Sequence, residues 1–220
     1  MTAPRAWPGR FVTLEGGEGA GKSTQAHLLA ERLRAAGHEA VLTREPGGVP
    51  QGEALRELLL SGERDRWSAM SEALLMYAAR VEHWRLKIQP ALARGAWVIC
   101  DRFADSSMAY QGYAGALGPD KIADLHRIAL GGVQPDLTFV LDVSAEMGLA
   151  RAAQRVAAAG EAATRFEKKD PAYHVRLAEA FRDIAKANPQ RCAILPADGE
   201  KVAIAASIWE IVVSRLGPVS

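Results

Sequence analysis

Residues 11–24 of the chain read FVTLEGGEGAGKST, and this stretch decides the fold. Its middle part, residues 16–23, matches the pattern G-x-x-x-x-G-K-S/T in full. The apolar run 11–14 before it predicts a strand, and the run 24–36 after it has the apolar spacing of a helix. A strand, this glycine-rich loop and a helix in that order are the context in which the pattern binds phosphate.

Each residue type in the loop has a chemical reason to be there. Glycines let the backbone curl so that several N–H groups point at phosphate oxygens, and the helix N-terminus adds a positive dipole. Lys22 can bridge the β- and γ-phosphates, and the Ser23 hydroxyl can bind Mg²⁺. We therefore expect the donor nucleotide to bind here, through Gly16, Gly17, Glu18, Gly19, Ala20, Gly21, Lys22, Ser23 and Thr24.

Outside the loop, predicted strands and helices alternate along the chain. The strands are expected at residues 11–14, 39–43, 97–101, 137–143 and 191–195. The helices are expected at 24–36, 51–60, 68–94 with a break near Pro90, 105–111, 119–130, 145–158, 171–187 and 200–216. This order predicts an α/β fold of the P-loop NTPase type, with three α/β/α layers and a five-stranded parallel sheet. We expect one domain over 1–220, with a mobile lid at about 157–170, where small and charged residues gather.

Composition excludes several other classes of protein. The net charge of +1 argues against a nucleic-acid or membrane-surface partner, and no apolar run reaches the length of a membrane span. The N-terminal residues 1–10 lack the apolar core of a secretory signal. The two cysteines, Cys100 and Cys192, lie in or beside predicted strands and are expected to be reduced core thiols. No cysteine or histidine spacing indicates zinc.

A phosphate-binding loop does not identify the phosphate acceptor. A kinase with an acceptor site and a nucleotide-driven switch or motor both remain possible at this point. The chain has no N-K-x-D guanine-reading motif and is short for a motor with a partner interface. A small-molecule kinase is therefore the leading interpretation.

Several motifs together resemble those of the bacterial thymidylate kinases. They occur in the family's order and extend over nearly the whole chain: FVTLEGGEGAGKS at 11–23, TREPGG at 43–48, LMYAAR at 75–80, DR at 101–102, SSMAYQG at 106–112 and PDLTFVLDV at 135–143. The resemblance implies the reaction ATP + dTMP → ADP + dTDP, for dTTP synthesis. The alternatives are a kinase with another nucleotide or nucleoside acceptor, and a P-loop regulatory module.

The resemblance implies contacts to the acceptor's sugar and phosphate. Glu18 would lie near the 3′-hydroxyl, and Tyr110 would press on the deoxyribose and disfavour a 2′-hydroxyl. Arg102, with Arg56 as a further candidate, would hold the acceptor phosphate. Asp101 would organise Mg²⁺ water or the acceptor, so Ser23 and Asp101 are the predicted metal residues.

It also implies contacts to the base. Tyr77 would stack on thymine, and Arg80, three residues later on the same helical face, would hydrogen-bond it. Ser107 would face the base, and Gln111 is a weaker candidate for its edge. The Glu45–Pro46 peptide would be cis.

The implied lid supplies arginines. The loop interior, residues 17–20, contains none, so the resemblance points to the lid for the catalytic arginine. Arg155 and Arg165 are the candidates, with Arg151 nearer the adenine and Glu167 orienting an arginine or approaching the acceptor sugar. The resemblance further implies a cytoplasmic homodimer that pairs through residues 69–94 and 123–130.

Overall fold

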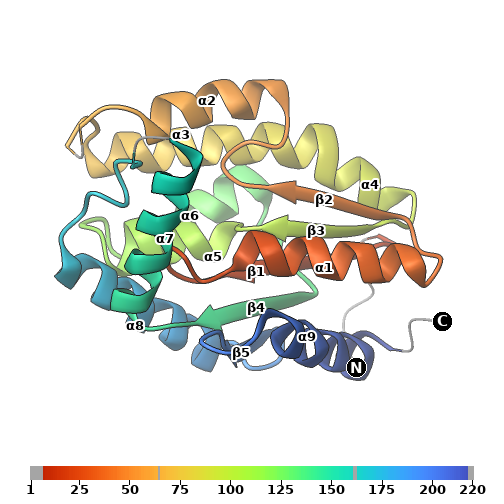
Figure 1. Cartoon of the computed structure of the whole chain (residues 1–220). Helices are drawn as coiled ribbons and strands as arrows, with labels where there is room; N and C mark the ends of the chain where they lie inside the picture. The colour runs from red at the N-terminus through yellow and green to blue at the C-terminus, as the bar shows by residue number, and fades with distance from the viewer. Residues whose placement is uncertain (1–6, 64, 161–162, 218–220) are drawn as a thin grey trace.

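The computed structural model describes residues 7–63, 65–160 and 163–217. Residues 1–6 of the N-terminal segment and 161–162 of the expected lid lie outside the described residues. At its centre is a parallel sheet in the order β2-β3-β1-β4-β5 (Figure 1). The strands are β1 Arg10–Glu15, β2 Ala40–Arg44, β3 Trp97–Asp101, β4 Leu137–Asp142 and β5 Cys192–Pro196. The predicted five-stranded parallel sheet is confirmed.

The helices cover both faces of this sheet. They are α1 Lys22–Ala35, α2 Pro50–Leu60, α3 Ala69–His83, the π-helical η1 Trp84–Ile88, α4 Gln89–Ala93, α5 Ala104–Ser107, the π-helical η2 Met108–Tyr113, α6 Pro119–Leu130, α7 Ala145–Ala159, α8 Pro171–Ala187 and α9 Lys201–Leu216. In Figure 1, α1 and α9 lie together on one side of the strands. The α/β fold of three layers is thereby confirmed.

Side chains of β1 point alternately to the two faces of the sheet, so this strand contributes to the hydrophobic core on each face. Val12 and Leu14 pack with the buried residues of α1 and α9. Phe11, pointing the other way, packs with Trp84 and Ile88 of the opposite layer. Successive strand residues point to opposite faces, so a strand buried on both sides reads as a continuous apolar run.

The long helix expected over 68–94 occurs, but it contains a widened turn. The π-helical segment Trp84–Ile88 joins α3 to α4, and Pro90 falls in the first turn of α4. Proline has no N–H for the hydrogen bond of a helix interior, and the π turn shifts the bonding pattern just before it. The expected helix at 105–111 is likewise a short α-helix followed by a π-helical turn.

The carboxyl ends of the central strands meet at one edge of the sheet. Leu14 of β1 and Arg44 of β2 both lie opposite Asp101 of β3 in the strand register. The loops that leave these three strands therefore start side by side, and such an edge is where open α/β sheets bind ligands.

Two further expectations concern the cysteines and membrane-spanning helices. Cys100 and Cys192 are free and buried, as predicted. No helix in the described ranges has both the length and the apolar character needed to cross a bilayer.

Candidate active site

The loop 16–23 has the backbone that phosphate binding requires. Gly19 and Gly21 have φ values of 64° and 87°, in the left-handed region where a side chain is strained. A Cβ at Gly19 would also lie 2.0 Å from the Gly148 carbonyl oxygen. Glycine at this position therefore lets the loop pack against α7.

Lys22 folds back over the same loop. Its ammonium group donates a 2.6 Å hydrogen bond to the Gly17 carbonyl oxygen, and the residue is only 7% exposed. Burial, together with the nearby Arg102 charge, lowers the pKa of Lys22 to about 8. Next to it, the Ser23 hydroxyl donates a hydrogen bond to the Asp101 carboxylate. The two predicted metal residues are thus in contact.

Arg102 connects the loop to the acceptor side. Its guanidinium group donates to the Gly16 carbonyl oxygen at 2.9 Å, to the Tyr110 hydroxyl at 2.8 Å and to Glu18 at 3.2 Å. The Tyr110 hydroxyl in turn donates to Glu18 at 2.6 Å. Burial works against the charge of Arg102, but Tyr110 and Glu18 outweigh it and raise the pKa of the arginine.

Glu18 keeps its charge in this network. Burial alone would raise the pKa of its carboxyl group, but Arg102, Lys22 and the hydrogen bond from Tyr110 lower that pKa to about 2. Glu18 is therefore an ionised acceptor that faces the cavity at neutral pH.

A cavity of about 390 Å³ opens beside this network. Most of the predicted acceptor and catalytic residues line it: Glu18, Lys22, Ser23, Arg56, Arg80, Asp101, Arg102, Ser107, Tyr110, Gln111 and Arg155. Thr164, Phe166 and Glu167 of the expected lid line it as well. The structure thus brings together residues from six separate segments of the chain.

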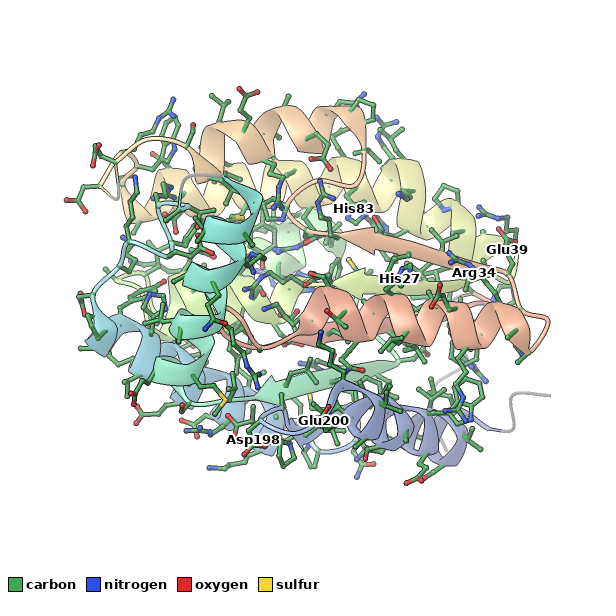
Figure 2. All side chains as sticks on the ribbon, viewed as in Figure 1. His27, Arg34, Glu39, His83, Asp198 and Glu200 are labelled. Atoms are coloured by element: carbon green, nitrogen blue, oxygen red, sulfur yellow. The ribbon has the colours of Figure 1, made fainter. Side chains whose placement is uncertain are left out.

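The wall opposite the phosphate loop is a buried polar network around Arg80. Arg80 donates to Glu45 at 2.7 Å and to Ser107 at 2.9 Å. The other oxygen of Glu45 contacts His83 Nδ1 at 3.0 Å, and His83 Nε2 lies 2.7 Å from the Thr43 hydroxyl. Figure 2 shows His83 inside the molecule, between α3 and the end of β2. Burial would raise the pKa of Glu45, but Arg80 and His83 outweigh it and lower that pKa.

The turn that carries Glu45 has the predicted cis peptide before Pro46. Arg56 donates a 2.7 Å hydrogen bond to the Pro46 carbonyl oxygen, so it reaches the cavity from α2. Gln111, at the end of the cavity, donates to Glu72 at 2.7 Å.

The structure corrects the prediction for Tyr77. Its ring is 2% exposed and packs with Ala73 and Ile122 between α3 and α6, not in the cavity. Met76, one residue earlier, lines the cavity in its place. One residue along a helix is a rotation of about 100°, and this places Tyr77 on the core-facing side of α3.

The prediction that Arg165 is a catalytic lid arginine is also corrected. Arg165 is fully buried, donates to the Leu59 carbonyl oxygen at 2.5 Å and forms an ion pair with Glu72. It fastens the segment after α7 to α2 and α3 and does not line the cavity. Of the two candidates, Arg155 lines the cavity, where it pairs with Glu167 at 2.6 Å.

Arg151, which was expected nearer the adenine, lies on α7 beside the loop. It donates to the Ala197 carbonyl oxygen at 2.8 Å, and its Cβ lies near Gly19. The described ranges contain no group of three or more histidine, cysteine or acidic side chains that could hold a metal ion by themselves.

Comparison with known proteins agrees with this geometry. The family model described as Thymidylate kinase matches residues 14–208. The chain belongs to the thymidylate kinase family. The thymidylate kinase of Caulobacter vibrioides is 54% identical over 209 residues, which cover 95% of this chain and 98% of that protein. That of Nitrobacter hamburgensis is 49% identical over 208 residues, covering 94% and 90%.

A solved structure in the thymidylate kinase family has the same fold. The crystal structure of thymidylate kinase from Ehrlichia chaffeensis superposes with a TM-score of 0.74 at 34% sequence identity, covering 93% of this chain and 98% of that chain. The P-loop NTPase-type fold expected from residues 11–24 is therefore confirmed.

The sequence did not predict several buried residues that support the site. Glu15, Glu45, Glu72 and His83 are all buried polar residues that hold site residues in place. Glu45 could have been found, because it lies inside the TREPGG motif, and His83 follows Arg80 at helical spacing. Nothing in the local sequence marks Glu72, because its partners are distant along the chain.

The lowered pKa of Glu18 predicts a pH dependence of stability. Its folded-state pKa of about 2 lies below the ordinary value of 4.5, so ionised Glu18 stabilises the fold above about pH 4.5. That contribution is lost as the pH falls through 4.5 towards 2. We expect the difference in unfolding free energy between wild type and Glu18→Gln to shrink on acidification from about pH 6 to about pH 3, measured by urea denaturation. A difference that is constant or grows over this range would contradict the assignment.

Proposed function

We propose that the chain is an ATP-dependent thymidylate kinase, which transfers the γ-phosphoryl group of ATP to dTMP to give dTDP, for dTTP synthesis. The observation that carries the proposal is the juxtaposition of a complete phosphate-binding loop with a cavity walled by Glu18, Arg102 and Tyr110. Membership in the thymidylate kinase family supplies the reaction. We treat residues 1–220 as one kinase domain with a lid at about 157–170.

The donor phosphates bind the loop in this proposal. The backbone N–H groups from Gly16 to Thr24 and the α1 N-terminus hold the phosphate oxygens, and Lys22 supplies a point charge. The Lys22 ammonium group donates to the Gly17 carbonyl oxygen within the loop, and this hydrogen bond holds it over the place where phosphate would bind. Arg151 lies behind the loop on the adenine side.

Mg²⁺ fits the residues at the mouth of the loop. The Ser23 hydroxyl and the Asp101 carboxylate are hard oxygen ligands, and their mutual hydrogen bond brings both to one point. We propose that these two residues hold the ion, Asp101 either directly or through water. The bound ion would neutralise charge on the transferring phosphoryl group.

The acceptor nucleotide occupies the cavity. Arg102 and Arg56, both of which line the cavity, would bind its phosphate through their positive charges. Glu18 and Tyr110 would contact its sugar. Arg80, Ser107 and Gln111 supply polar groups for the base. Because Met76 and not Tyr77 lines the cavity, we propose that the Met76 thioether packs on the base.

Positioning and charge stabilisation are sufficient for this reaction. The acceptor phosphate is already anionic, so neither a covalent intermediate nor a strong general base is required. Arg155 lines the cavity from α7, and its positive charge would stabilise the negative charge on the phosphoryl group during transfer. Its partner Glu167 orients it from the lid.

The proposed location is the cytoplasm, where ATP and dTMP are available. No nucleic-acid or membrane partner is proposed.

The acceptor can be tested with purified protein, ATP, Mg²⁺ and one monophosphate at a time. Among dTMP, dUMP, UMP, CMP, AMP and GMP, we expect dTMP to have the highest kcat/KM, because the chain belongs to the thymidylate kinase family. ADP release is measured by a coupled assay. Preference for another monophosphate would reject the acceptor, and the absence of ADP release with all six would reject the kinase.

The two lid arginines should respond differently to substitution. Arg155→Ala is expected to lower kcat by roughly 10²-fold or more, with a smaller change in KM for dTMP, because it acts on the transferred group. Arg165→Ala removes the partner of a buried carboxylate and should lower the unfolding free energy by about 3 kcal/mol. Steady-state kinetics and urea denaturation measure the two effects.

Arg182→Ala is the matched control for Arg155→Ala. Arg182 is a partly exposed arginine that pairs with Asp142 outside the cavity, and kcat should be unchanged. Full turnover by Arg155→Ala would contradict its role.

We also propose a homodimer that pairs through residues 69–94 and 123–130. Exposed apolar side chains on these helices support it, since Met70, Leu74 and Ile128 are 43%, 51% and 74% exposed. Sedimentation velocity should give a dimer, and Ile128→Glu should shift it toward monomer. A monomer at all concentrations would contradict the proposal.

A further inference from the structure

Arg102 has a backbone conformation that needs an explanation. Its φ of 73° is the one positive value among the non-glycine residues of the described ranges. L residues rarely adopt this conformation, and they keep it where the surrounding structure holds it. Its backbone N–H donates to the Leu14 carbonyl oxygen at 3.0 Å, and its own carbonyl accepts from the Cys100 thiol at 3.0 Å.

Glu15 holds the other side of this turn. It is the last residue of β1 and is fully buried. One carboxyl oxygen accepts from the Phe103 backbone N–H at 2.7 Å, directly after Arg102. The second oxygen accepts from the Ser106 hydroxyl at 2.6 Å.

The same hydroxyl reaches the Arg102 side chain. Ser106 donates its single hydrogen to Glu15, so its lone pairs are available to the guanidinium group, which donates to it at 3.1 Å. Glu15 therefore acts on Arg102 twice, through the following peptide and through Ser106. Glu15 does not line the cavity, so these contacts are its means of influencing the site.

The position is electrostatically unfavourable for a carboxylate. Burial, with the nearby charge of Asp105, raises the pKa of Glu15 to about 8. A buried acid with no positively charged hydrogen-bond partner is costly to retain unless its hydrogen bonds matter.

We propose that Glu15 is a positioning residue, whose two hydrogen bonds keep Arg102 in its left-handed conformation with the guanidinium group aimed into the acceptor cavity. The proposal rests on the role of Arg102 as a ligand of the acceptor phosphate. Without Glu15, the peptide after Arg102 loses its acceptor and the turn relaxes toward an ordinary conformation. The guanidinium group then leaves the place where dTMP phosphate would bind.

Three substitutions at Glu15 separate the effect of side-chain length from the effect of the carboxyl group. Glu15→Ala removes both hydrogen bonds and should lower kcat/KM for dTMP by about 10²-fold, the usual effect of a misplacement near 1 Å. KM for ATP should stay within about twofold, because the loop contacts remain. Glu15→Gln keeps the length: its amide oxygen can accept from Phe103 and its NH2 group can donate to the Ser106 oxygen, so it should recover most of the loss. Glu15→Asp keeps the carboxyl group but is one methylene shorter, and it should resemble Glu15→Ala.

Thr13→Val is the matched control. Thr13 lies on the same face of β1, is fully buried and forms a 2.8 Å hydrogen bond with Thr138 that does not involve Arg102. The variant should lower the melting temperature and leave kcat and both KM values unchanged. It shows what loss of a buried hydrogen bond does when Arg102 is not affected.

A double-mutant cycle tests whether Glu15 acts through Arg102. If it does, Glu15→Ala with Arg102→Ala should be no less active than Arg102→Ala alone. A further loss in the double variant, or a folded Glu15→Ala with wild-type kcat/KM for dTMP, would overturn the proposal.

If Glu15→Ala does not fold, the order of Glu15→Gln and Glu15→Asp decides. A more active Glu15→Asp would overturn the proposal, since the presence of a carboxyl group rather than the length of the side chain would then matter. Full activity of Arg102→Ala would instead reject the role of Arg102 in the proposed function, whatever the Glu15 variants do.

Discussion

The hydrogen bonds of the Arg102 guanidinium group join the phosphate loop to the helical segment after β3. Parallel strands with the register Leu14 opposite Asp101 make β1 and β3 end together, so the phosphate loop and the turn after β3 leave the sheet side by side. Arg102 spans that gap, from the Gly16 carbonyl oxygen to Glu18 and Tyr110. A shift of either strand would move the guanidinium group relative to the phosphate loop, so the geometry of this side of the cavity depends on the sheet.

The walls of the acceptor cavity are held by buried charges that satisfy one another. Glu45 accepts from Arg80 and contacts His83, and each partner has a further hydrogen bond. A fully connected network in a low dielectric is rigid, because breaking one bond leaves a buried charge unpaired. The pair of Arg155 and Glu167 differs, since the arginine side chain is 59% exposed. An exposed pair is weak and can exchange partners, which is consistent with the role proposed for Arg155.

The sequence predicted the elements well because their signals are local. The strand positions follow from short apolar runs, and the phosphate loop follows from a motif in its proper context. Errors arose where one residue of helical rotation matters, or where a partner is distant along the chain. Tyr77 and Met76 are neighbours in an apolar stretch, and only the packing of α3 on α6 sends the tyrosine inward. Arg165 has the sequence context of a lid arginine, but Leu59 and Glu72 bind it 106 and 93 residues away.

By itself the sequence determined the parallel sheet and the phosphate loop, because the strand signals and the loop motif each consist of residues adjacent in the chain, and the resemblance of motifs along the chain implied the reaction. The tertiary structure decided that Arg155 and not Arg165 lines the cavity, that Met76 and not Tyr77 does so, and which groups form hydrogen bonds around Arg102. These depend on the register of β1 against β3 and on the rotation of helices about their axes. Glu15 illustrates the difference: in sequence it is the end of an apolar strand, and in the fold it is bonded to residues 88 and 91 positions away. Long-range contacts of that kind follow from how the strands pair, and no local pattern encodes them.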